Sequence, residues 1–135
     1  MALDYGEKRI GIALTDVTHT ICSPYTTYNR KNFALDMDYL CNLIKEKNAK
    51  IVVIGLPLNM DGSSGARVDS TKEFANALSK RIDAKIEFVD ERLSSVYAEE
   101  FLLDMDVSRA KRKQVIDKMA AQIILKSFMD TYKGE

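Results

Sequence analysis

The sequence predicts an α/β fold with a mixed five-stranded sheet flanked by helices. Residues 3–29 contain three successive stretches with the alternation, or the β-branched and aromatic content, of strands. Two further strand-like runs each follow a stretch with helical spacing, and helices close the chain. Strands joined by hairpins lie antiparallel, whereas strands separated by a helix lie parallel. We therefore expect a mixed sheet with helices on its faces.

The first two strands are expected to form a hairpin. In the opening stretch, LDYGEKRIGIALTD, the apolar residues Ile10, Ile12 and Leu14 alternate with small ones, and Gly6 begins the turn. A third strand follows in HTICSPYTTYNR. Pro24 lies within it, which is typical of a strand at the edge of a sheet.

The rest of the chain alternates helices with strands. Apolar residues recur at helical spacing within 32–49: Leu35, Tyr39, Leu40, Leu43 and Ile44. The run IVVIGLP, residues 51–57, is typical of a strand buried on both faces. A second apolar helical stripe follows, made of Val68, Thr71, Phe74, Ala75 and Leu78. After the strand KIEFVDE, helices are predicted over 95–103 and 108–132. This order, β-β-β-α-β-α-β-α, indicates a ribonuclease H-like fold with a central first strand.

Length and composition indicate one domain, residues 1–135, in a cytoplasmic protein. Twenty basic residues balance twenty acidic ones, which excludes a general polycation for nucleic acid but leaves room for a local basic face. No apolar run approaches the roughly 18 residues of a membrane span, and the start lacks a signal sequence. Cys22 and Cys41 have no metal-binding spacing, so we expect reduced thiols.

Acidic residues lie at three places where packing alone would not put them. Asp4 lies inside the first strand, and Asp90 and Glu91 stand at the end of the last strand. Asp117 lies beside the apolar stripe of the final helix. In the predicted fold Asp4, Asp117 and one acid of the Asp90–Glu91 pair converge. Neighbouring strand residues point to opposite faces, so the sequence leaves open which of that pair faces the site; Glu91 is preferred and Asp90 is the reserve.

Such a cluster suits a divalent metal ion. Carboxylates close together repel one another and resist ionisation unless a cation lies among them, and ligands that are all oxygen suit Mg²⁺ or Mn²⁺. Two ions about 4 Å apart can clamp a phosphodiester, so we expect one or two ions. The one histidine, His19, has no partner motif, and no nucleophile–histidine triad can be assembled.

Basic residues adjoin the predicted acidic site. Cations at a helix start are unfavourable for the helix dipole, so a cluster before Asp117 suggests a phosphate ligand. That cluster comprises Arg109, Lys111, Arg112 and Lys113. Lys8, Arg9 and Arg92 extend the positive rim. The loop GLPLNMDGSSGAR, which ends at Arg67, precedes a helix whose amides can hold phosphate. Arg67 is thereby a candidate contact for a nucleic-acid backbone.

Four segments together resemble the YqgF family, also called RuvX: LDYGEKRIGIALTD, VIGLPLNMDGSSGAR, FVDERLS and VIDKMAAQIIL. The resemblance runs from Leu3 to Tyr132. It implies a ribonuclease H-like fold related to the Holliday-junction resolvase RuvC, and a bacterial cytoplasmic nuclease. It further implies that Asp4, the DER motif at 90–92 and Asp117 are the family's acidic positions. Only three residues precede Asp4, fewer than is usual in this family, so we expect either a short first strand or an incomplete beginning of the chain. Related nucleases carry a glutamate on the fourth strand, where this chain has IVVIGLP; Glu91 is then its substitute.

The resemblance implies two alternative substrates for a nuclease, and a function outside the enzymes also stays open. The family is regarded as acting in 5′-end maturation of pre-16S ribosomal RNA, and an older proposal is resolution of branched DNA junctions. A resolvase needs a stable dimer, whereas an RNA nuclease works as a monomer or weak homodimer. A non-catalytic RNA- or ribosome-binding factor is the alternative outside the enzymes. An actin-like kinase, which begins with a similar hairpin, needs two domains and does not fit this length.

Overall fold

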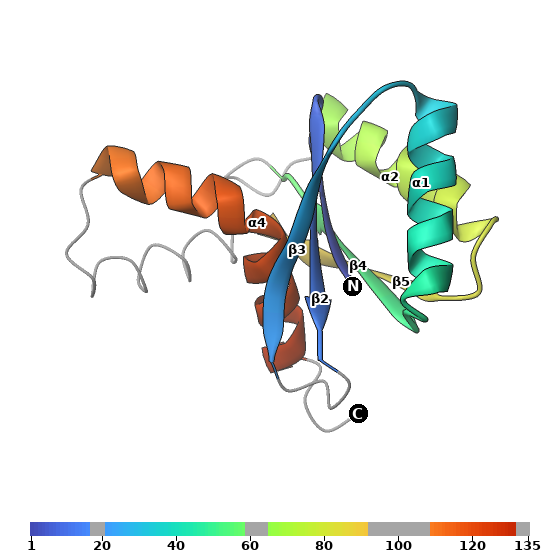
Figure 1. Ribbon diagram of the computed structural model, residues 1–135. Coiled ribbons are helices and arrows are strands. Elements are labelled where there is room, and N and C mark those ends of the chain that lie inside the picture. Colours follow the sequence, from blue (N-terminus) through green and yellow to red (C-terminus); the bar gives the residue numbers. More distant parts are fainter. Residues whose placement is uncertain (17–20, 59–64, 92–108, 132–135) are drawn as a thin grey trace.

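The structure is a computed structural model that describes residues 1–16, 21–58, 65–91 and 109–131, except for the side chains of 109–118 and 131 (Figure 1). The strands are β1 (Ala2–Tyr5), β2 (Arg9–Thr15), β3 (Cys22–Asn29), β4 (Ile51–Leu56) and β5 (Lys85–Asp90). The helices are α1 (Phe33–Glu46), α2 (Ala66–Ser79) and α4 (Arg109–Thr131). This order confirms the α/β prediction. The helix predicted over 95–103 lies outside the described residues.

The strands form one mixed five-stranded sheet in the order β3-β2-β1-β4-β5. The β1–β2 and β2–β3 pairs are antiparallel, whereas β1–β4 and β4–β5 are parallel. The first strand is therefore central, as predicted. It is also short, at four residues. Strand β4 is buried along most of its length, which confirms the interpretation of its apolar run.

Helices α1 and α2 cover one face of the sheet, and α4 crosses the other (Figure 1). The core beneath α1 and α2 contains large side chains, among them Leu3, Ile54 and Phe74. The Phe74 ring stacks on the Tyr5 ring at 4.0 Å between centroids. The whole predicted stripe of α2 is buried. No helix in the described part of the chain is long and apolar enough to cross a membrane.

On β1 and β2, the sheet face toward α4 is lined by small residues. Ala2, Ala13 and Ala121 are buried there together. A Cβ built on Gly11 would lie 3.6 Å from the Cβ of Ala121, so this helix approaches the strands closely. The opposite face carries bulky residues instead. The two layers of the core therefore differ in thickness, and the thin layer is the one that contains Asp4.

The predicted apolar stripe of α1 is wrong at its first position. Leu35 is 48% exposed, whereas the neighbouring Asp36 is only 2% exposed. The Asp36 carboxylate turns inward because it accepts hydrogen bonds from Arg30 Nε at 3.0 Å and from the Lys31 amide at 2.9 Å. Arg30 also donates to the Gly6 carbonyl at 3.0 Å. This junction fixes the β1–β2 turn to the start of α1.

Candidate active site

The structure brings Asp4 and Glu91 together. Asp4 lies near the end of β1, and Glu91 follows the last residue of β5. Leu3 is in register with Ile54, and Leu56 is in register with Asp90, so the parallel strands β1, β4 and β5 end at the same edge. A hydrogen bond joins the side chains of Asp4 and Glu91. A bond between two carboxyl groups requires a proton on one of them.

Burial and neighbouring charge make the Glu91 carboxyl a weak acid. Burial, which is the largest cause, and the charge and hydrogen bond of Asp4 together raise the pKa of Glu91 to about 7. The charge of Asp90 also raises this pKa, whereas Arg67 lowers it. Without a bound cation, the pair therefore holds a shared proton near neutral pH. A positive ion beside the pair would replace that proton.

Strand β4 makes room for the Glu91 side chain. A Cβ on Gly55 would lie 2.6 Å from Glu91 Oε1 and 2.7 Å from Ile124 Cδ1. Glu91 thus lies over the fourth strand, between β4 and α4. On β2, at the other side of β1, a Cβ on Gly11 would lie 3.6 Å from the Asp4 Cβ. The sequence interpretation missed Gly55; the available signal was a glycine inside a β-branched strand, which often marks a close approach.

Asp90 precedes Glu91 in the chain, and its negative charge raises the pKa of Glu91. It is the last residue of β5 and is half-buried. Val89 packs in the cluster under α4, so alternation along the strand turns Asp90 toward the other face. The chain leaves the strand at Glu91, and this residue reaches Asp4. Of the two acids that the sequence left open, Glu91 is the one hydrogen-bonded to Asp4.

The third predicted acid, Asp117, lies in α4, and its side chain is outside the described part of the chain. Within the described side chains, no three metal-binding residues form a group that could hold an ion. The structure therefore shows the geometry of two of the three predicted ligands. Arg92 lies outside the described residues. The basic cluster falls in the first turns of α4, again without described side chains: Arg109, Lys111, Arg112 and Lys113.

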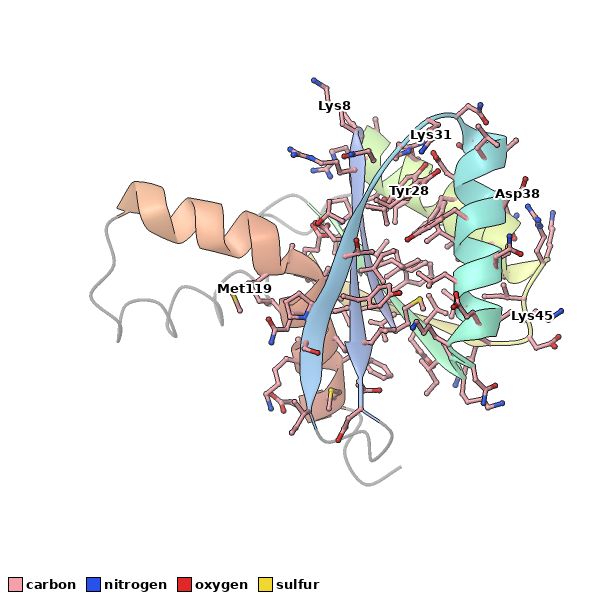
Figure 2. The ribbon with its side chains drawn as sticks, viewed as in Figure 1. Lys8, Tyr28, Lys31, Asp38, Lys45 and Met119 are labelled. Carbon is pink, nitrogen blue, oxygen red and sulfur yellow. The ribbon has the colours of Figure 1, made fainter. Side chains whose placement is uncertain are left out.

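The other predicted basic residues lie in the β1–β2 turn, at the start of β2 and at the start of α2. Lys8 lies in the β1–β2 turn, at one end of the molecule (Figure 2), and Arg9 begins β2. Both side chains are exposed. Arg67 lies in the first turn of α2, and its charge acts on Glu91. Positive charge is thus available on the turn beside Asp4 and on the helix near Glu91.

The chain is similar to known proteins over almost its whole length. The family model RuvX, described as Holliday junction resolvase, matches residues 1–131. A protein of Ruegeria sp. strain TM1040 named "Putative pre-16S rRNA nuclease" is 45% identical over 130 residues, covering 96% of this chain and 83% of that protein. A protein of the same name from Caldanaerobacter subterraneus is 42% identical over 135 residues, 99% of this chain and 97% of that one. The chain therefore belongs to the RuvX family of nucleases.

Proposed function

We propose that this chain hydrolyses phosphodiester bonds of precursor 16S ribosomal RNA with the help of a divalent cation. The observation that carries the proposal is the hydrogen-bonded Asp4–Glu91 pair, held at the end of the central strand beside exposed basic residues. Its relatives are named for this substrate. Cleavage of an rRNA precursor would take place in the cytoplasm. A monomer or weak homodimer would suffice, because cutting one RNA strand does not need two paired active sites.

The acid pair fits a hard cation such as Mg²⁺ or Mn²⁺. Two carboxylates supply only oxygen ligands, which these ions prefer. The raised pKa of Glu91 measures how poorly the site tolerates two negative charges without a cation. Asp4 and Glu91 would hold the ion, with Asp117 as the third ligand. When bound, one or two such ions would activate water for attack on phosphorus and stabilise the leaving oxygen.

The basic side chains would bind the RNA backbone. Arg9 lies on the same sheet face as Asp4, because Ile10 and Ile12 pack in the core on the opposite face. Arg67 adds a positive charge from the start of α2. We assign the same role to Lys8 and to the predicted residues whose side chains are not described: Arg92, Arg109, Lys111, Arg112 and Lys113. Contacts of this kind position a strand without reading its sequence.

A second candidate substrate is a four-way DNA junction. The description of the matching family favours it. The same carboxylates would serve, since phosphodiester hydrolysis by a metal centre does not depend on the sugar. A resolvase must cut two strands symmetrically, so this function would require a stable dimer.

The test is cleavage of labelled precursor 16S RNA and of a labelled four-way DNA junction, each with Mg²⁺, Mn²⁺ or EDTA. We expect RNA cleavage that needs both the metal and Asp4, so that Asp4→Asn abolishes it. Asp38→Asn is the matched control, because Asp38 is an exposed acid on α1. Cleavage of the junction alone would establish the second candidate. RNA binding without cleavage of either substrate would indicate a ribosome-binding factor instead.

A further inference from the structure

We propose that Arg30 is a positioning residue for substrate binding: it fixes the β1–β2 turn, so that Lys8 and Arg9 hold an RNA phosphate beside Asp4. This inference rests on the proposed function, which assigns phosphate contacts to Lys8 and Arg9. It adds a residue that neither contacts the substrate nor holds the metal ion. The effect of Arg30 passes through the backbone of the turn.

Arg30 donates hydrogen bonds to three successive carbonyl groups of the turn. Its Nη1 donates to the Gly6 carbonyl at 3.0 Å and to the Glu7 carbonyl at 3.3 Å. Its backbone amide donates to the Lys8 carbonyl at 2.9 Å. Within the turn, the Gly6 amide donates to the Arg9 carbonyl at 2.9 Å. The backbone of the turn is therefore tied to a single residue at the end of β3.

The Arg30 guanidinium is itself held in one orientation. Asp36 is only 2% exposed and accepts a hydrogen bond from Arg30 Nε at 3.0 Å. The same carboxylate accepts from the Lys31 amide at 2.9 Å and from the Tyr28 side chain. The guanidinium carbon also lies 4.6 Å from the centre of the Tyr5 ring. Because a guanidinium donates in several fixed directions at once, it links the position of α1 to that of the turn.

The turn carries positive charge that can reach a phosphate at Asp4. Asp4 is in register with Gly11, and Arg9 precedes Gly11 by two residues on the same face of β2. Such diagonal neighbours lie about 7–8 Å apart, within reach of a long side chain. Lys8 and Arg9 are exposed, and among the described residues neither forms an ion pair. Both charges are therefore available to a phosphate.

A fixed turn makes these charges more effective. Lysine and arginine side chains are long and flexible, so ordering them on a ligand costs binding free energy. That cost is smaller when the backbone already holds them beside the site. Arg30 supplies this order without offering its own charge, since its side chain is only 21% exposed and pairs with Asp36. Without Arg30, we expect Lys8 and Arg9 to be present but loosely placed.

The experiment measures binding of a fluorescein-labelled RNA that spans the 5′ end of 16S rRNA in its precursor, by fluorescence anisotropy in EDTA. We expect Arg30→Gln and Asp36→Asn each to weaken binding about tenfold. A purely electrostatic effect predicts opposite results, because one change removes a positive charge and the other a negative charge. Arg81→Gln and Asp38→Asn are the matched controls. They alter an exposed arginine–aspartate pair that is joined at 2.8 Å, and both should keep wild-type affinity.

A double-mutant cycle tests whether Arg30 acts through the turn. In a Lys8→Ala, Arg9→Ala background, Arg30→Gln should cause little further loss of affinity, because the side chains that it positions are gone. An additive loss would overturn the inference, since Arg30 would then contact the RNA itself. Arg30→Lys keeps the charge but cannot donate to Asp36 and to the turn together, so it should lose affinity as Arg30→Gln does. Wild-type affinity in Arg30→Lys would also overturn the inference.

Mn²⁺ binding, measured by titration calorimetry, distinguishes the turn from the rest of the site. Arg30→Gln should keep wild-type Mn²⁺ affinity, because Asp4 is held by the pairing of β1 with β2 and β4. A parallel loss of Mn²⁺ and RNA affinity would overturn a role confined to the turn. Circular dichroism and urea unfolding identify the variants that are folded under the assay conditions. Arg30→Lys is the mildest change and keeps the inference testable if another variant does not fold.

The outcomes also separate this inference from the proposed function. If Lys8→Ala, Arg9→Ala weakens RNA binding but Arg30→Gln does not, the positioning role is wrong and the nuclease stands. Wild-type protein that neither binds nor cleaves RNA would contradict the proposed function itself.

Discussion

The carboxylate of Glu91 occupies the space that a side chain on Gly55 would need. A Cβ on Gly55 would lie 2.6 Å from Glu91 Oε1, far inside contact distance. Because Gly55 has no side chain, strand β4 leaves a space in the site, and the carboxylate of Glu91, which follows β5, occupies that space. The acid pair depends on this glycine as much as on Asp4.

We predict that Gly55→Ala displaces Glu91 from Asp4. The atoms that the new methyl group would meet most closely, Glu91 Oε1 and Ile124 Cδ1, are the ends of flexible side chains, so the fold should survive with a loss of about 1–3 kcal/mol. The affinity for Mn²⁺, measured by titration calorimetry, should fall about tenfold or more, and cleavage should fall with it. Gly11→Ala is the control, because its new methyl group would make ordinary contacts at 3.6 Å. Wild-type Mn²⁺ affinity in Gly55→Ala would contradict this account.

The hydrophobic spacing of the sequence predicted the elements of the fold because spacing of apolar residues reflects burial locally. It failed at Leu35, where a hydrogen bond from Arg30, in the segment before α1, turns Asp36 inward and leaves the leucine exposed. Spacing also could not choose between Asp90 and Glu91. That choice depends on where the chain leaves β5, and the contact with Gly55 comes from another strand.

The stability of the metal-free protein should fall as pH rises from about 4.5 to about 7. The pKa of Glu91 is about 7 in the folded chain against an ordinary value of 4.5, so the folded state binds this proton more tightly than the unfolded state. The contribution is complete below pH 4.5 and is lost as pH passes through 7. The expected loss in free energy of unfolding is on the order of 3 kcal/mol. Urea unfolding in EDTA at several pH values measures it.

Glu91→Gln should remove most of that pH dependence, because glutamine keeps a polar group beside Asp4 but cannot titrate. Glu87→Gln is the control: Glu87 lies on β5 and pairs with Lys85 at 2.8 Å, away from the acid pair. Mg²⁺ should stabilise the wild type at pH 8 and stabilise Glu91→Gln less, since binding to the folded state raises the free energy of unfolding. If the free energy of unfolding of Glu91→Gln falls with pH as steeply as that of the wild type, other groups cause the pH dependence.

Asp36→Ala should destabilise the fold by about 3 kcal/mol, because it leaves the Arg30 guanidinium and the Lys31 amide without their acceptor. Burial would raise the pKa of Asp36, but the bonds from Lys31, Arg30 and Tyr28 outweigh burial and lower it. Its contribution is therefore present above pH 4 and is lost only in stronger acid. Asp38→Ala, which breaks the exposed pair with Arg81, should cost less than about 1 kcal/mol. Equal losses in urea unfolding would refute the assignment of Asp36 to the core.

Ala121→Leu should separate α4 from the sheet. Ala121 is 5% exposed and faces Gly11, where no space remains for a longer side chain. We expect a loss of about 1–3 kcal/mol in the free energy of unfolding. Because Ile124, one turn further along α4, packs over Gly55 beside Glu91, moving the helix should also weaken Mn²⁺ binding. Ala34→Leu, at an exposed position of α1, should change neither quantity. If Ala121→Leu keeps wild-type stability, α4 is not packed on β2 as closely as the distances indicate. If the variant loses stability but keeps its Mn²⁺ affinity, Ile124 does not hold Glu91 in place.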